Sequence, residues 1–86
     1  TRSDYMALQI EETEVFKGSS LSGQVLRDAG LRQTLGLIVV AIKRADGKML
    51  FNPEPESLIA DGDILITLGA KKQQDELRAL AATLAT

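Results

Sequence analysis

Apolar and polar residues alternate near the start of the chain, from Leu8 to Glu11. This pattern predicts a half-buried β-strand over Met6–Val15. Leu8 and Ile10 are separated by one polar residue, which is the period-two spacing of a strand with one buried face. The second half of the segment is acidic, which favours an exposed or edge position. The polar stretch Lys17–Ser20 then ends the pattern and predicts a loop.

The next segment, Leu21–Ala29, predicts a short helix of two or three turns. Its apolar residues recur at helical spacing on one face, and polar side chains occupy the opposite face. Ser20 or Ser22 can supply the N-cap, because a hydroxyl there accepts a hydrogen bond from an otherwise unpaired backbone N–H. Gly30 suits the position after the helix, where a left-handed φ costs glycine little.

Leu37–Ala45 is a mostly apolar segment that predicts a second strand. It begins with six consecutive apolar residues, four of them β-branched, which is typical of a strand that is apolar on both faces. The dipeptide Asp46–Gly47 has the composition of a two-residue hairpin turn. Lys48–Phe51 returns as the third strand, and the two prolines that follow end it because they cannot donate a ladder hydrogen bond.

The remainder of the chain predicts one more strand and an amphipathic helix. Asp61–Asp63 forms a turn around a glycine, and Ile64–Gly69 is an apolar strand. Lys72–Leu84 carries apolar residues at the i, i+3, i+4, i+7 spacing of a helix with one buried face. The element order is therefore β-α-β-β-β-α. We expect a single small α+β domain over residues 1–86, with two helices and a mixed or antiparallel sheet.

The two-sided apolar strand raises the question of what covers both faces of the sheet. Two short helices cannot easily do so in a domain of 86 residues, which buries a modest share of its surface. A homodimer with Leu37–Ile42 or the helix Leu21–Ala29 near the interface would cover the remaining face. The alternative is that the first helix and the loops suffice.

The composition excludes several classes of site. The chain has no Cys and no His, which removes thiol nucleophiles, imidazole bases and Cys/His zinc sites. The net charge is −2 and the pI is about 5.0, and the cationic side chains are scattered, so we expect no nucleic-acid binding. The longest apolar run is far shorter than the roughly 20 residues of a membrane helix, so we expect no direct membrane insertion.

Several short motifs, in order, resemble the C-terminal subdomain of regulator-of-potassium-conductance proteins, the TrkA-C or RCK-C domain. The resemblance covers about Leu8 to Leu84. It consists of an apolar strand, a tight turn, a strand ending in Asn-Pro-x-Pro, a Gly-Asp turn and a glycine before the last helix. The segments that carry it are Ala41–Arg44, Asp46–Gly47, Asn52–Pro55, Gly62–Asp63 and Gly69.

The resemblance implies a cytosolic regulatory domain that dimerises and helps to gate cation transport. Such domains are appendages of bacterial potassium channels and uptake systems. They usually follow a Rossmann-like nucleotide-binding subdomain. Because the sequence begins at Thr1 and has no GxGxxG motif, we expect a piece of a longer protein. Its expected partners are that subdomain and a membrane pore or transport subunit, on the cytoplasmic side of the membrane. The alternative is a dimerisation or ligand-binding domain of a cation–proton or anion transporter, without a ligand.

The resemblance also implies a candidate ligand, cyclic di-AMP, because some members of the family bind it across the dimer interface. Each matching residue also has a simpler interpretation: the two apolar residues suit a plain core, the arginine a salt bridge, and the asparagine a turn before proline. No other cofactor is expected. The tentative ligand-binding residues are Ile38, Val39, Arg44, Asn52 and Pro53.

Metal binding and catalysis are weaker alternatives. Glu11, Glu12 and Glu14 cluster at one strand end, and Asp61 and Asp63 flank a glycine. Calcium needs six to eight oxygen ligands, and neither group resembles an EF-hand loop. The glutamates suit a solvated edge that discourages strand pairing between molecules, and the aspartates suit a turn. No carboxylate pattern indicates a buried catalytic acid or base, so we expect no metal site and no enzyme.

Overall fold

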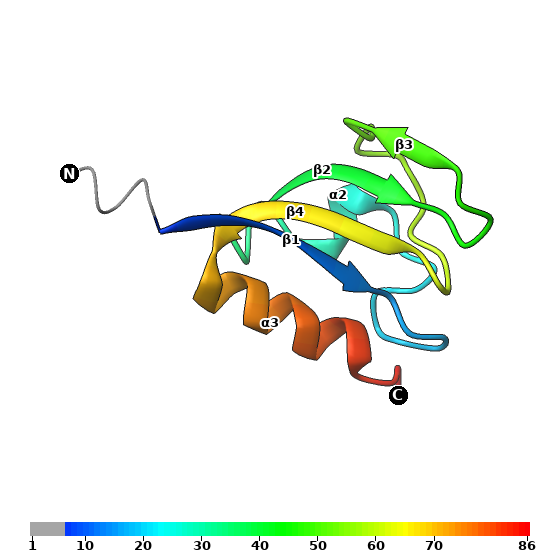
Figure 1. Cartoon of the computed structure of the whole chain (residues 1–86). Coiled ribbons are helices and arrows are strands. Elements are labelled where there is room, and N and C mark those ends of the chain that lie inside the picture. The colour runs from blue at the N-terminus through cyan, green and yellow to red at the C-terminus, as the bar shows by residue number, and fades with distance from the viewer. Residues whose placement is uncertain (1–6) are drawn as a thin grey trace.

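The computed structural model describes residues 7–86 and shows a sheet with its helices on one side (Figure 1). The order of the elements confirms the predicted β-α-β-β-β-α arrangement, and each predicted segment overlaps one of them. The elements are β1 Leu8–Glu14, α2 Leu26–Ala29, β2 Ile38–Lys43, β3 Met49–Phe51, β4 Ile64–Ala70 and α3 Lys71–Ala82.

The four strands form one sheet in the order β1-β4-β2-β3, and every neighbouring pair is antiparallel. Of the two expected forms, mixed and antiparallel, the sheet has the antiparallel one. The last strand, β4, lies in the middle, and the acidic β1 lies at an edge as predicted. The register of β2 against β4 shifts between Val39 and Ala41, so Val40 is an extra residue that bends the strand.

The first helix is much shorter than predicted. The expected helix Leu21–Ala29 is helical only from Leu26, and its N-cap is Val25, without a side-chain hydrogen bond. The proposed serine caps are wrong, because Ser22 donates its hydroxyl hydrogen bond to Asp61 and Ser20 donates to a backbone carbonyl of α3. Gly30 does end the helix in a left-handed conformation, with φ 73°, as expected for glycine.

The β2–β3 hairpin has one more residue in its loop than the two predicted. The backbone N–H of Arg44 donates to the carbonyl of Lys48 at 2.7 Å, so Ala45, Asp46 and Gly47 form a three-residue loop. Gly47 has φ 90°, and the N–H of Lys48 donates to the Asp46 carboxylate at 2.9 Å. A three-residue loop with a left-handed glycine at its end is a common hairpin connection.

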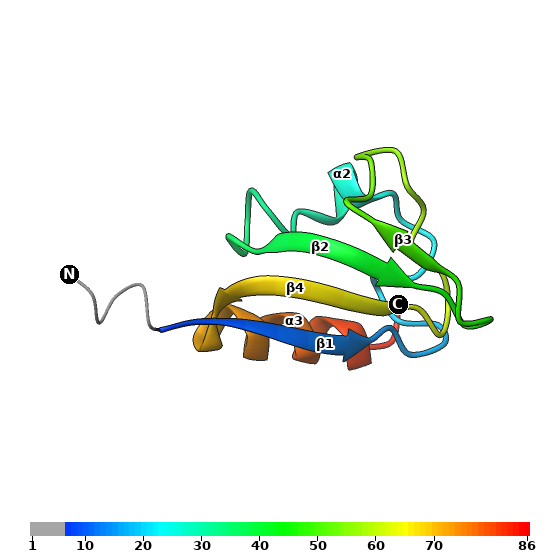
Figure 2. The ribbon, with the colours of Figure 1, turned by 45° about the horizontal axis from the view of Figure 1, so that its top comes forward.

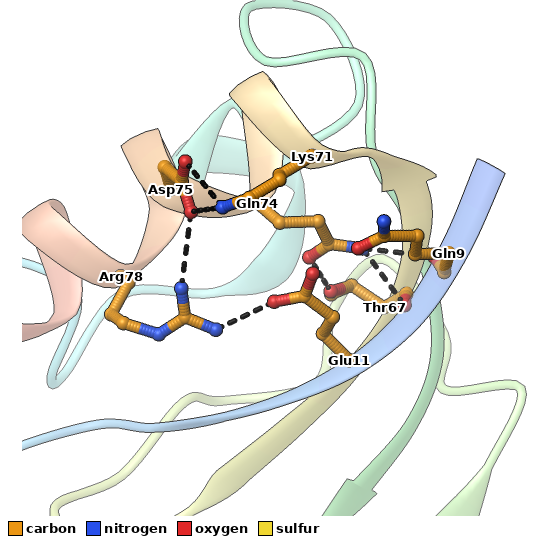
Figure 3. Close-up of polar contacts among 7 residues, drawn as sticks. All are labelled: Gln9, Glu11, Thr67, Lys71, Gln74, Asp75 and Arg78. Atoms are coloured by element: carbon orange, nitrogen blue, oxygen red, sulfur yellow. Dashed lines mark hydrogen bonds and ion pairs between the residues drawn. The ribbon is translucent and has the colours of Figure 1, made fainter. Parts of the chain in front are cut away.

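Helix α3 packs on β1 and β4 and is fixed there by a buried amide (Figures 1 and 3). Gln74 is fully buried. Its Nε2 donates to the carbonyls of Gln9 and Thr67, both at 3.1 Å, and its Oε1 accepts from the Thr67 hydroxyl at 2.6 Å. At the surface, Arg78 of α3 pairs with Glu11 at 2.6 Å, and this contact raises the pKa of Arg78. These contacts set the position of the helix along the strands.

The core lies between the sheet and the layer made by α3, α2 and the loops. Gly69 marks the closest approach in it, because a Cβ there would lie 2.3 Å from Cδ2 of Leu37. Alanine at this position would require the packing to shift. The fully enclosed core comprises Val15, Leu21, Leu31, Leu35, Leu37, Ile42, Ile59, Leu65, Leu77 and Ala81.

No helix within residues 7–86 lies over the opposite face of the sheet, and that face is largely apolar. In Figure 2, β1 and β4 lie in front of α3, so this face is turned toward the viewer. Directly paired residues of antiparallel strands point to the same face, so the register identifies its members. We call this surface the open face. Its residues are Leu8, Ile10, Glu12 and Glu14 of β1, Ile64, Ile66, Leu68 and Ala70 of β4, Ile38, Ala41 and Lys43 of β2, and Met49 and Phe51 of β3.

Candidate functional site

A hollow of about 600 Å³ lies beside β2, between α2 with its following loop and the chain just after β3. Its volume is typical of sites that bind small molecules. β2 supplies one wall, and β3 pairs with only the second half of β2, so the first half is left uncovered along this edge. The residues that line the hollow are Leu26, Arg27, Leu31, Arg32, Gln33, Leu37, Ile38, Val39, Asn52, Pro53 and Pro55.

The lining combines apolar walls with two positive charges. Among the residues of the described chain that line it, Arg27 and Arg32 are charged and none carries a carboxylate. The guanidinium of Arg27 has two carboxylates nearby. Its Nη1 lies 3.7 Å from Oε1 of Glu56, and its Nε lies 3.8 Å from Oδ1 of Asp28. Arg32 is exposed and forms no ion pair within residues 7–86. The hollow therefore has the chemistry to hold an anionic molecule that also has flat apolar parts.

Four of the five predicted ligand-binding residues meet in this hollow: Ile38, Val39, Asn52 and Pro53. Ile38 is 57% exposed and also belongs to the open face, whereas Val39 is half-buried and packs against the core. Asn52 has φ 46°, a left-handed conformation that asparagine tolerates well. Its backbone N–H donates to the carbonyl of Val40 at 2.8 Å. Asn52 therefore lies at a bend of the chain just after β3, and it also lines the hollow.

Arg44 is the predicted residue that does not line the hollow. Its guanidinium pairs with the buried carboxylate of Asp63 at 2.5 Å and donates to the carbonyl of Leu58 at 2.7 Å. Asp63 also accepts a hydrogen bond from the N–H of Ala60 at 2.8 Å. Arg44 thus holds the loop before β4 against the end of β2, which is the salt-bridge interpretation of this residue.

The acidic clusters have local partners. Asp61 accepts hydrogen bonds from the Ser22 hydroxyl and from the N–H of Gly18, and these contacts hold its pKa below the usual value. Asp63 pairs with Arg44 and Glu11 with Arg78. Across residues 7–86, no group of three or more acidic side chains is arranged to hold a metal ion. The absence of catalytic activity stays a prediction.

Arg27 and Arg32 are not among the ligand-binding residues predicted from the sequence. They are five residues apart on α2 and in the following loop, and in the sequence they look like two surface cations on a polar face. Both line the hollow because the left-handed Gly30 turns the chain between them. The local signal that could have identified them is a pair of arginines flanking a glycine helix stop, with Asn-Pro downstream.

Comparison with protein families matches residues 10–82 to the TrkA-C domain. The chain belongs to the TrkA-C family. This result confirms the resemblance noted in the sequence, and the family domain includes every residue that lines the hollow. The α+β architecture, with its four-stranded antiparallel sheet, is the fold of the RCK_C domains described below.

Two characterised relatives contain similar segments within longer proteins. The chain is 33% identical over 64 residues to potassium channel protein 1 of Methanocaldococcus jannaschii, covering 74% of this chain and 19% of the relative. It is 33% identical over 70 residues to the K(+)/H(+) antiporter subunit KhtT of Bacillus subtilis, covering 81% of this chain and 42% of the relative. The chain therefore spans less than half the length of either relative.

A solved structure of the RCK C domain of the potassium transport protein KtrA, in complex with cyclic di-AMP, has a similar fold. The TM-score is 0.75 at 26% identity, and the alignment covers 91% of this chain and 93% of that domain. No helix within residues 7–86 is long and apolar enough to cross a bilayer.

Proposed function

We propose that this chain is the ligand-sensing regulatory module of a potassium channel or transport system, that it acts as a homodimer, and that it binds cyclic di-AMP in the hollow. The module lies on the cytoplasmic side of the membrane and follows a Rossmann-like subdomain in the full protein. It changes the state of a pore or transport subunit and performs no chemistry of its own.

The observation that carries this proposal is the lining of the hollow. Cyclic di-AMP presents two adenine rings and two phosphates. Ile38, Val39 and Pro53 offer apolar surfaces for a ring, and the Asn52 amide can read its edge. Arg27 and Arg32 supply positive charge for a phosphate. The similar KtrA domain was solved in complex with this ligand.

The mechanism is a shift between dimer arrangements. A ligand that touches both subunits binds one relative orientation more tightly than another and so raises its population. The preference passes to the attached transport unit by thermodynamic linkage. Within each subunit, the Arg44–Asp63 pair joins the end of β2 to the loop before β4, so β2 and β4 move together when the ligand contacts the start of β2.

Isothermal titration calorimetry with cyclic di-AMP tests the proposal. Two variants probe the hollow: Arg32→Ala removes a cation, and Asn52→Gly removes an amide while tolerating the left-handed φ of 46°. We expect binding by the wild type, a loss of about 1.5–3 kcal/mol for Arg32→Ala and about 1 kcal/mol for Asn52→Gly. Lys72→Ala, an equal change of charge on α3 away from the hollow, is the control and should bind normally.

Two results would contradict the proposal in different ways. No heat of binding and no thermal shift with the wild type would remove cyclic di-AMP as the ligand. Binding that is equally strong in the wild type, Arg32→Ala and Asn52→Gly would place the ligand outside the hollow. Cyclic di-GMP serves as a second control, because it has the same phosphates and different base edges.

The alternative parent is a carrier instead of a channel. The relatives above include a channel protein and an antiporter subunit at the same 33% identity. Ion-flux measurements on the full protein, with and without the ligand, would distinguish the two.

A further inference from the structure

We propose that two copies of this chain pack open face to open face, with the two-fold axis running along β4, and that Glu14 of each copy pairs with Lys43 of the other. The inference rests on the homodimer of the proposed function and specifies its surface, its axis and its register.

The open face is too apolar to be left in water. Ile10 is 66% exposed, Leu8 50%, Ile38 57% and Phe51 72%. Leu8, Ile10 and Ile38 adjoin the half-buried outer residues of β4, and Phe51 lies one strand further away, beside Ala41 of β2. A continuous apolar surface of this kind marks an interaction site. Stacked sheets lie about 10 Å apart and keep their strands within about 30° of one another, so a second copy of the same face can cover it.

The charged residues of the open face lie in the two rows nearer one end, Glu12 beside Ile66 and Glu14 with Lys43 in the last row. The register places Glu14, Ile64 and Lys43 in one row across β1, β4 and β2. At the other end, Ile10, Leu68 and Ile38 form an apolar row. A two-fold axis across the strands would place the charged row of one copy on the apolar row of the other, which buries unpaired charge. An axis along the strands places like rows together.

The axis along β4 also pairs opposite charges. It leaves the two ends of the sheet in place and exchanges the two sides, so β1 of one copy lies over β2 of the other. The acidic strand then faces the strand that carries Lys43. Both side chains are exposed in the single chain, and both are long enough to meet across stacked sheets. The symmetry forms the pair twice.

The same axis brings the two hollows to one end of the dimer. Ile38 lines the hollow and also lies at the apolar end of the open face, one strand away from β4. Both copies of Ile38 therefore lie near the axis on opposite sides of it. This arrangement lets a single symmetric ligand contact both subunits.

Charge reversal followed by sedimentation equilibrium tests the register. We expect Glu14→Lys and Lys43→Glu each to raise the dimer Kd by about tenfold or more, because two attractive contacts become repulsive. The double variant should restore a Kd near that of the wild type. Glu76→Lys on α3 is the matched control and should not change the Kd. Circular dichroism checks that each variant is folded.

Cysteine cross-linking tests the direction of the axis, and the absence of Cys from the chain gives a clean background. Leu68→Cys should link to its own copy through a short bis-maleimide, as should Ile64→Cys. Linking only in a mixture of the two variants would show an axis across the strands and overturn the inference. Single reversals without effect, or no restoration in the double variant, would overturn it while leaving the homodimer standing. A monomeric wild type would overturn both.

Discussion

Among single residues, Arg44 matches a ligand-binding position of the family, but its guanidinium already forms contacts within the chain. Its side chain is 28% exposed, less than any other cation among the ion pairs of residues 7–86, and the side chain of its partner Asp63 is 2% exposed. The sequence places Arg44 after an apolar strand, where a solvated strand end or a salt bridge is a simpler interpretation than a ligand contact. The structure assigns it the salt bridge, and Asn52 a bend that also lines the hollow.

Arg44→Ala should therefore reduce stability rather than ligand affinity. Removing the guanidinium leaves the Asp63 carboxylate buried without its cation, which costs about 2–3 kcal/mol. Urea unfolding measures the loss, and calorimetry with cyclic di-AMP on the folded variant should give an affinity close to the wild type. Arg78→Ala, which removes the surface pair with Glu11, is the control and should cost less. Equal losses, or weakened ligand binding by folded Arg44→Ala, would show that Arg44 has a different role.

At the scale of elements, the sequence predicted each strand and the last helix to within a few residues, because their periodicity is local. It failed at the first helix for a non-local reason. The N–H of Gly23 donates to the carbonyl of Ile59 at 2.7 Å, and the N–H of Leu26 donates to that of Ser57 at 2.9 Å. These contacts with a distant loop replace the helical hydrogen bonds, and no pattern within Leu21–Ala29 reveals them.

The candidate site was predictable to a similar extent. The resemblance supplied the residues on β2 and after β3, because they lie within short motifs. Arg27 and Arg32 were not predicted to line the hollow, because their position beside β2 depends on how the irregular segment after α2 packs. For the open face, the sequence predicted only that two short helices would not easily cover both faces of the sheet. Its charged and apolar rows depend on the register between β1, β4 and β2, which a linear pattern does not determine.

The element most dependent on one polar side chain is α3. Gln74→Ala should remove the hydrogen bonds that join the helix to β1 and β4 and leave the Thr67 hydroxyl and two carbonyls without their partner. We expect a loss of about 2–3 kcal/mol, measured by urea unfolding. Gln73→Ala, the same change one residue earlier on the helix, should cost about 0.5 kcal/mol or less. A loss no larger than that of the control would mean that apolar packing alone positions α3.

For the molecule as a whole, the proposed dimer makes stability and ligand response depend on the open face. A domain of 86 residues buries only a modest share of its surface by itself, and many of its large apolar side chains lie on the open face instead of in the core. In the proposed dimer, packing a second copy against that face would bury these side chains. The dimer would then be the unit that responds to a ligand, because Ile38 belongs both to the hollow and to the open face.

The binding of cyclic di-AMP and the association of two chains should be thermodynamically linked. In the proposed dimer both copies of Ile38, which line the hollows, lie near the axis at one end, so cyclic di-AMP should bind with a stoichiometry of one molecule per two chains. By reciprocity, it should tighten dimerisation by the same factor by which dimerisation tightens its binding. At a free ligand concentration of 100 times its Kd, the dimer should gain about 2.7 kcal/mol. Sedimentation equilibrium across a ligand series measures the gain, and Glu14→Lys, weakened in dimerisation but intact in its hollow, is the matched control with a lower ligand affinity. A stoichiometry of one ligand per chain, with equal affinity in Glu14→Lys, would instead describe a hollow that works alone within each subunit.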